Sequence, residues 1–322
     1  MPDYGSQAAE KTVRKIENRI KKVYSKARKD LQKELDEFTR KFKAKDAQKR
    51  ALLKAGKITI YQYDDWLGGQ VFIGNQWRAK INHCTEILAD ANKQALNIVN
   101  GDRLDVFAEN ANYIAYSLEK DLEMDIGFGI YDQSTVENLL REQPELLPRK
   151  ELHPGKDKAW NRVNIATAVT QGIISGDDIE TIATRIAEKT SSTNMKAMTR
   201  YARTAVTAAE NAGRIETLHR AEDMGIDVKK QWLATLDKRT RDSHQRLDGQ
   251  VKDVDEPFES IFGKIMYPGD PQAHPGDVYN CRCTLIYVLP GRQSSKRKDN
   301  ETKTLIPGDI TYTEWKRMKG YK

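Results

Sequence analysis

The sequence contains three cysteines among 322 residues, and two of them, Cys281 and Cys283, are only two positions apart. Such a set cannot form a disulfide framework and fits a reducing compartment. No apolar run approaches the roughly 20 residues that span a bilayer, and the N-terminal residues lack the basic-then-apolar pattern of a secretory signal. We therefore expect a soluble protein made in a cytoplasm, with no membrane partner.

Sequence signatures of several catalytic classes are also missing. The chain has no Gly-x-Ser-x-Gly, no His-Glu-x-x-His, no Walker loop and no His-x-Glu with Pro-Cys-x-x-Cys. Charged residues make up 31% and hydrophobic residues 38%, with a mean hydropathy of -0.74, so much of the chain must be solvated helix. We predict that the protein is not an enzyme and has no cofactor.

A long basic helix is predicted near the N-terminus. Between residues 11 and 57 there are 18 Lys or Arg and 6 Asp or Glu, which permits contact with nucleic acid or with an acidic partner. Aromatic residues for base stacking are sparse there, which favours an ordinary solvated face. Apolar residues recur at spacings of three and four, as in an amphipathic helix: Val13, Ile16, Ile20, Val23, Ala27, Leu31, Leu35, Phe38 and Phe42.

The remaining pattern predicts an α+β protein, with a long helical N-terminal region followed by a small mixed α+β C-terminal domain. Breaks at 143–149 and 153–155 place the boundary near residue 150. The expected parts are a charged helical extension (1–150), a second domain (151–290) and a flexible basic tail (291–322) in which 312–318, with Trp315, is a candidate docking segment.

Further elements follow from the same periodicity. The helix after residue 175 is expected to take Ser175 or Asp177 as its N-cap, and the small-residue-rich stretch ending at 223 is expected to pack closely on its neighbours. The expected helices are 58–100, 104–122, 132–140, 160–172, 177–188, 195–223 and 239–247; the expected strands are 228–236, 250–254 after a turn at Asp248-Gly249, and 283–289, within a domain of helices (160–224) and a small α+β part (228–290).

Dense charge gathers in residues 235–249, close to a second segment at 279–284. Acids, bases and a histidine this close together could be an active site. A structural cluster is the favoured interpretation, in which Asp237 caps the helix that starts near Arg239 and arginine forks tie carbonyls to carboxylates.

Metal ligands are a second possibility for the same segments. Cys281 and Cys283 share one face of an extended chain, and His244 and His274 could join them as zinc ligands. The alternative is that the thiols are packed or hydrogen-bonded. Cys84, beside His83, is expected on a helix face.

Taken together, these segments resemble the C-terminal domain of the phage Mu F-like minor head proteins. The resemblance covers about residues 160–290 and rests on 235–249, Phe258, 267–271, 280–284 and the Ala-Arg-Thr helix at 202–214. Members often have Cys-x-x-Cys where this chain has Arg241 and His244. That departure removes one thiolate, so that a four-ligand site would need His274, and no stoichiometric zinc is expected. The structural motif is assigned to Asp237, Arg239, Arg241, His244, Leu247, Asp248, Gly249, Asn280, Cys281, Arg282 and Cys283.

The resemblance implies a minor capsid protein of head morphogenesis in a tailed phage. Such a protein is associated with the portal protein, enclosed in the procapsid and assembled in the host cytoplasm, and it resides in the head interior of the virion. It acts in head assembly or in DNA packaging or ejection, with scaffolding protein, major capsid protein and phage DNA as further candidate partners. The rival hypotheses are a metal-dependent nuclease or hydrolase built on His244, Cys281 and Cys283, and a nucleic-acid-binding protein that uses the basic helix at 11–57.

Overall fold

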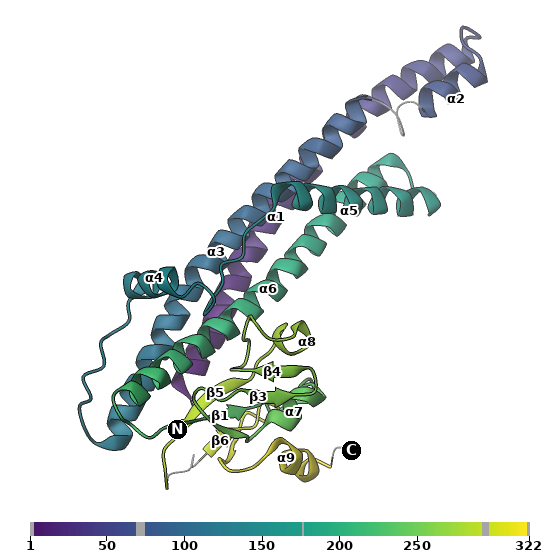
Figure 1. The fold of residues 1–322 in the computed structure, drawn as a ribbon. Helices are drawn as coiled ribbons and strands as arrows, with labels where there is room; N and C mark the ends of the chain where they lie inside the picture. The colour runs from purple at the N-terminus through teal and green to yellow at the C-terminus, as the bar shows by residue number, and fades with distance from the viewer. Residues whose placement is uncertain (1–2, 69–74, 176, 292–295, 321–322) are drawn as a thin grey trace. The chain divides into compact units, whose positions relative to one another are not determined.

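The computed structural model describes residues 3–68, 75–175, 177–291 and 296–320. Long helices form most of the first two thirds of the chain, and short antiparallel strands follow (Figure 1). The chain is therefore of the α+β class, as predicted. Within the described ranges, no helix is both long and apolar enough to cross a membrane.

The predicted N-terminal helix is confirmed and is longer than expected. Helix α1 spans Tyr4–Lys54. The apolar stripe read from the sequence is its buried face, with Ile16, Ile20 and Leu31 fully buried. The basic residues of α1 lie mainly on its exposed face, as the spacing requires.

Helix α3 corrects the prediction of two helices at 58–100 and 104–122. A short helix, α2 (Ile60–Gly68), is followed by α3 (Asn75–Leu122), which continues through Gly101; residues 69–74 lie outside the described residues. The polar side chains beside Gly101 find partners outside the helix, because Asn100 Nδ2 donates to Lys150 O at 3.1 Å and Arg103 Nη1 donates to Pro148 O at 2.6 Å. The local break signal is therefore overridden by tertiary hydrogen bonds.

Helix α6 corrects a second predicted break. Helices α4 (Gln133–Glu142) and α5 (Pro154–Ile174) correspond to the expected 132–140 and 160–172 with shifted bounds. The helices expected at 177–188 and 195–223 are instead one helix, α6 (Ile179–Asp223). In the polar stretch between them, Thr190 Oγ1 and Asn194 Nδ2 donate to carbonyls one turn earlier, and Asn194 Nδ2 also donates to Asn161 Oδ1 of α5. These polar side chains are therefore satisfied while the backbone stays helical. Asp178, rather than the predicted Ser175 or Asp177, accepts from Thr181 N at 2.7 Å at the start of the helix.

By their internal contacts, the residues form two compact units. Unit 1 comprises Met1–Glu17, Ile98–Lys150 and Thr199–Lys322, and unit 2 comprises Asn18–Asn97 and Glu151–Met198. The expected division at residues 150 and 290 stays a prediction. Unit 2 is helical, and Cys84 lies on α3 within its core. The buried core residues come from α1, α3, α5 and α6: Leu31, Leu35, Cys84, Leu88, Ile165, Ala168, Ile182, Ala183, Ile186 and Ala187.

Unit 1 contains the small sheet. Strand β1 (Lys229–Leu233) lies between β2 (Val251–Asp253) and β5 (Thr284–Val288), and both pairings are antiparallel. The predicted strands are thus present with shorter bounds. Trp232 and Leu285, which are paired in the register of β1 and β5, are fully buried.

Two short helices and a hairpin join these strands. Helix α7 (Asp242–Leu247) begins three residues later than predicted. Strands β3 (Phe258–Ser260) and β4 (Gly263–Ile265) form an antiparallel hairpin, and α8 (Pro275–Val278) precedes the cysteine pair. The ring of Trp232 packs edge-on against Phe258 and His244, with centroids 5.4 Å away in both cases.

The expectation of a flexible tail at 291–322 is wrong for residues 296–320. Strands β6 (Lys296–Lys298) and β7 (Leu305–Pro307) pair, and α9 (Tyr312–Met318) follows with a capping box between Thr311 and Glu314. Tyr312 and Trp315 are buried. Composition alone misled the prediction, because charged residues in this stretch have buried partners rather than solvent.

Candidate functional site

Helix α6 holds the cysteine loop through a row of polar side chains. Thr204, Thr207 and Asn211 recur at spacings of three and four, so they share one face of the helix. Thr204 Oγ1 accepts from Asn280 N at 3.1 Å, and Thr207 Oγ1 donates to Cys281 O at 2.8 Å. Asn211 Oδ1 accepts from Leu285 N at 2.6 Å. The Ala-Arg-Thr helix therefore acts as a template for the backbone of the loop.

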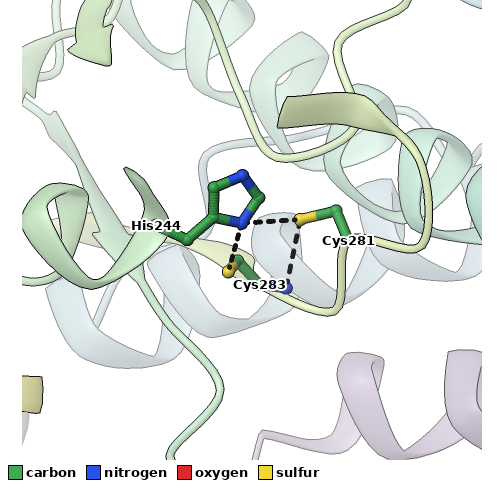
Figure 2. Close-up of side chains that lie close together, drawn as sticks. All are labelled: His244, Cys281 and Cys283. Atoms are coloured by element: carbon green, nitrogen blue, oxygen red, sulfur yellow. Dashed lines mark hydrogen bonds between the residues drawn. The ribbon is translucent and has the colours of Figure 1, made fainter. Parts of the chain in front are cut away.

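Three side chains with metal-ligating atoms meet in this part of unit 1. His244 lies on α7, whereas Cys281 and Cys283 lie in the loop before β5. Figure 2 shows both sulfurs facing the same ring nitrogen of the histidine. Nδ1 is 3.6 Å from Cys281 Sγ and 3.3 Å from Cys283 Sγ. All three side chains are buried.

The two thiols have opposite ionisation tendencies. Burial raises the pKa of the Cys281 thiol well above its usual value, and the neighbouring Cys283 adds to the increase. At Cys283 burial also opposes ionisation, but hydrogen bonds from Cys281 and His244 lower the pKa well below its usual value. Negative charge is therefore favoured on the Cys283 sulfur.

The other ring nitrogen of His244 faces a carboxylate. His244 Nε2 lies 3.4 Å from Asp277 Oδ1, and both side chains are 2% exposed. Asp277 comes from α8, and its Oδ2 accepts a hydrogen bond from Ser260 Oγ. Asp277 is not predicted as a site residue from the sequence, because an aspartate in a Gly- and Pro-rich loop gives no local sign that it is buried.

His274 does not join the cluster as the fourth member that the sequence suggested. Its Nδ1 accepts a hydrogen bond from Gly276 N at 3.1 Å and caps α8. Its ring stacks on Phe262 with a centroid distance of 4.9 Å. The candidate set of four therefore reduces to His244, Cys281 and Cys283.

Arg241 and Asp237 support the loop from the other side. The guanidinium of Arg241 donates to the carbonyls of Gly276 and Tyr279, as the arginine-fork hypothesis anticipated. Asp237 forms an ion pair with Arg282 and accepts from Arg239 N at 2.9 Å. The prediction that Asp237 caps the following helix is wrong, since the N-cap of α7 is Arg241 and it makes no side-chain cap bond.

Leu247, Asp248 and Gly249 each have a separate physical role. Leu247 is fully buried, and Gly249 has a φ of +81°, which a residue with a side chain rarely adopts. Asp248 accepts from Ala234 N at 2.7 Å and from both terminal nitrogens of Arg297 at 3.0 Å. The Asp248 carboxylate thus connects Ala234, the residue after β1, to Arg297 of β6. Arg297 was missed because the tail was expected to be flexible.

Two kinds of chemistry fit the cluster of His244, the two cysteines and Asp277. A thiolate, an imidazole and a carboxylate in a row could activate a nucleophile. However, the three side chains are only 2–3% exposed. The cavity that borders all three has a volume of about 20 Å³, which is room for one water, and the cleft of about 1810 Å³ nearby is lined by Cys281 but not by His244 or Cys283. Activation of a nucleophile would also use only one of the two sulfurs. Metal ligation uses all three atoms.

We predict that the Asp237–Arg282 contact stabilises the loop. Asp237→Ala removes a charged hydrogen-bond acceptor and should lower the free energy of unfolding by about 1–2 kcal/mol. Arg282→Ala should have a similar effect, and the double variant should cost less than the sum of the two. Urea denaturation measures all three. Arg239→Ala is the control, because its side chain is 79% exposed and its loss should change stability by less than about 0.5 kcal/mol. Additive effects would contradict the prediction.

Comparisons with known proteins agree with the resemblance seen in the sequence. The family model for Phage Mu protein F like protein matches residues 163–286. Minor head protein GP7 of Bacillus phage SPP1 is 31% identical over 231 residues, which are 70% of this chain and 73% of GP7. No solved structure matches the chain. The chain belongs to the Phage Mu F-like family of phage minor head proteins.

Two further relatives are longer proteins. NAD(+)--arginine ADP-ribosyltransferase EFV of Enterococcus faecalis is 33% identical over 211 residues, which are 65% of this chain and 42% of EFV. An uncharacterized protein of Haemophilus influenzae is 27% identical over 208 residues, or 64% of this chain and 42% of that protein. The chain therefore spans less than half the length of these two relatives.

Proposed function

We propose that this chain is a minor component of the head of a tailed phage that associates with the portal protein in the procapsid. It acts there in head assembly or in DNA packaging or ejection and stays in the head interior. The similarity to a minor head protein over 73% of that protein's length carries the proposal. Scaffolding protein, major capsid protein and phage DNA are the further partners.

The fold is consistent with a structural role. The charged side chains after β1 hold the backbone of other segments. Arg241 and Asp237 form hydrogen bonds with loop atoms, and Asp248 bonds Ala234, the residue after β1, and Arg297 of β6. Such side chains position protein segments rather than a substrate. The structural assignment of the motif remains our proposal, and the Asp237 variants described above test it.

The comparisons do not favour the two rival functions. A nuclease or hydrolase at His244, Cys281 and Cys283 would need its substrate to reach side chains that are only 2–3% exposed. The nucleic-acid-binding alternative for residues 11–57 rests on exposed basic residues, such as Lys22, Lys29 and Lys33, and not on the comparisons. The transferase activity in the name of EFV belongs to a protein of which this chain spans 42%.

The proposal can be tested by expressing a tagged form of the chain together with the structural proteins of the phage. We expect it in purified procapsids and virions at far fewer copies than the major capsid protein, and in a complex with the portal protein when the two are expressed together. Protease added to intact heads should leave it uncut, because it is enclosed, whereas protease added after the heads are opened should digest it. A tail protein, cut in both cases, is the control.

Two results would overturn the proposal. Absence of the chain from both procapsids and virions would reject a head component. Digestion in intact heads at the same rate as the tail protein would reject an interior location. The nucleic-acid-binding alternative would be favoured if the chain were absent from heads and the isolated chain bound DNA with an affinity that falls steeply as the salt concentration increases.

A further inference from the structure

The spacing of the three buried donor atoms matches a tetrahedral metal site. Bonds of about 2.3 Å from zinc to sulfur and about 2.0–2.1 Å to nitrogen place a sulfur and a nitrogen roughly 3.5–3.6 Å apart in such a site. The distances from His244 Nδ1 are 3.6 Å to Cys281 Sγ and 3.3 Å to Cys283 Sγ. Both sulfur-to-nitrogen distances therefore lie within about 0.3 Å of the values for a tetrahedral site, and all three donor atoms lie within 4.8 Å of one another.

Hydrogen bonding among these groups explains the arrangement less well than a bound cation does. Each imidazole nitrogen can make one hydrogen bond, either as donor or as acceptor. Both sulfurs converge on the same nitrogen (Figure 2), so one of the two contacts is left without a proton or a lone pair. A cation at the centre satisfies both sulfurs and the nitrogen together.

The surroundings of the ligands have the form that metal sites require. A ligating histidine usually donates its other ring N–H to a carboxylate, and His244 Nε2 faces Asp277 Oδ1 at 3.4 Å. Ligating sulfurs are themselves hydrogen-bonded, and Cys283 N donates to Cys281 Sγ at 3.4 Å. Neither Nε2 nor Asp277 Oδ1 has another hydrogen-bond partner among the described residues, and a carboxylate beside Nε2 favours the tautomer that is protonated there, which leaves the lone pair of Nδ1 for the metal.

A fourth ligand position is open beside the cluster. The cavity of about 20 Å³ is bordered by His244, Cys281 and Cys283, and this volume is enough for one water molecule. Arg241 borders the same cavity but directs its guanidinium to the carbonyls of Gly276 and Tyr279. Arg241, which stands where members of the family often have a cysteine, therefore does not occupy this position.

We propose that His244 Nδ1, Cys281 Sγ and Cys283 Sγ bind one zinc ion, with a water as the fourth ligand and Asp277 as the positioning residue of the histidine. Two sulfurs and one imidazole are a ligand set typical of zinc. Both thiols lose their protons on binding. The ion would connect α7 to the loop before β5 and so clamp together segments 37 residues apart. This inference reverses the expectation of no stoichiometric zinc, and it does not depend on the proposed head function.

Elemental analysis of the full chain, purified without chelator, tests the proposal. We expect about one zinc per chain, and about one again after chelation and reconstitution with zinc chloride. Cobalt in place of zinc should give thiolate-to-cobalt charge-transfer absorption together with the strong visible bands of tetrahedral coordination. These two measurements need no variant, so they stand even if a substitution prevents folding. Less than about a tenth of an ion per chain after reconstitution would overturn the proposal.

Variants identify the ligands. Cys281→Ser and Cys283→Ser should each abolish stoichiometric zinc and the charge-transfer band, whereas Cys84→Ala, the third cysteine in the chain, should keep both. Asp277→Asn should retain the ion but weaken its affinity about 10–100-fold. A zinc ion that remains in both serine variants lies elsewhere, for example at the cluster of His219, Glu222 and Asp255, and would reject this ligand set.

Discussion

Replacement of Arg214 by methionine is expected to lower the free energy of unfolding by about 3–5 kcal/mol, because it leaves buried acceptors without their partner. The Arg214 side chain is fully buried on α6. Its terminal nitrogens donate to the two carboxylate oxygens of Asp3 at 2.6 and 2.8 Å, and one also donates to Leu285 O at 2.9 Å. Its Nε donates to Asn110 Oδ1 at 3.0 Å. Because Arg214 Nη2 also donates to Ser6 Oγ of α1 at 3.2 Å, one side chain links α1 and the residue before it to α3, α6 and β5 within unit 1.

Arg203→Met is the matched control for this experiment. Arg203 lies on the same helix and also pairs with an acid, Glu17, but its side chain is 50% exposed. Solvent screens that pair, so its loss should cost less than about 1 kcal/mol. Chemical denaturation of both variants gives the comparison. Equal decreases in the free energy of unfolding would mean that burial does not determine how much the Arg214 contacts stabilise the protein.

Gly213→Ala is expected to destabilise the protein by about 1–3 kcal/mol, although alanine is the better helix former. A Cβ atom at Gly213 would lie 2.3 Å from Phe107 O and 3.2 Å from Ala111 N, and both are backbone atoms of α3. Backbone cannot move aside as a flexible side chain can, so α3 and α6 would have to separate. The overlap outweighs a propensity gain of about 1 kcal/mol.

Gly101→Ala separates the two contributions. Gly101 also lies inside a helix, α3, but a Cβ atom there meets nothing within 4 Å. This variant should therefore gain about 0.5–1 kcal/mol from propensity alone. Thermal denaturation should move the two midpoints in opposite directions. A stabilised Gly213→Ala variant would show that the close approach of α3 and α6 is not required.

Close packing of α6 was anticipated from its composition, and the family was recognised from motifs. Ala-rich spacing near Gly213 indicated a helix without bulky side chains, and the contact with Phe107 confirms it. The motifs in 235–249 and 280–284 are sufficient to indicate the family from the sequence alone. Each depends on local requirements, such as the positive φ at Gly249, and local requirements are visible in sequence.

Other features depended on partners far away in the chain. Helix α6 continues through its polar stretch because Asn194 Nδ2 also reaches Asn161 Oδ1 at 2.9 Å. Residues 296–320 are not a loose tail, since Arg297 has a buried ion pair with Asp248 at 3.0 Å. In both cases, the charge or polarity of the residues predicted exposure to solvent, whereas a partner far away in the chain allows them to be buried.

The amino-acid sequence by itself determined the long amphipathic helix α1, the strand β5, the turn at Gly249 and the family, because periodicity, β-branched runs and glycine act over a few residues. The tertiary structure alone decided which donors meet. His244 and Cys281 converge because α6 holds the cysteine loop, and Asp277, rather than His274, completes the cluster because α8 turns one inward and stacks the other on Phe262. Side-chain direction after a loop is set by packing between distant segments, which no local pattern records.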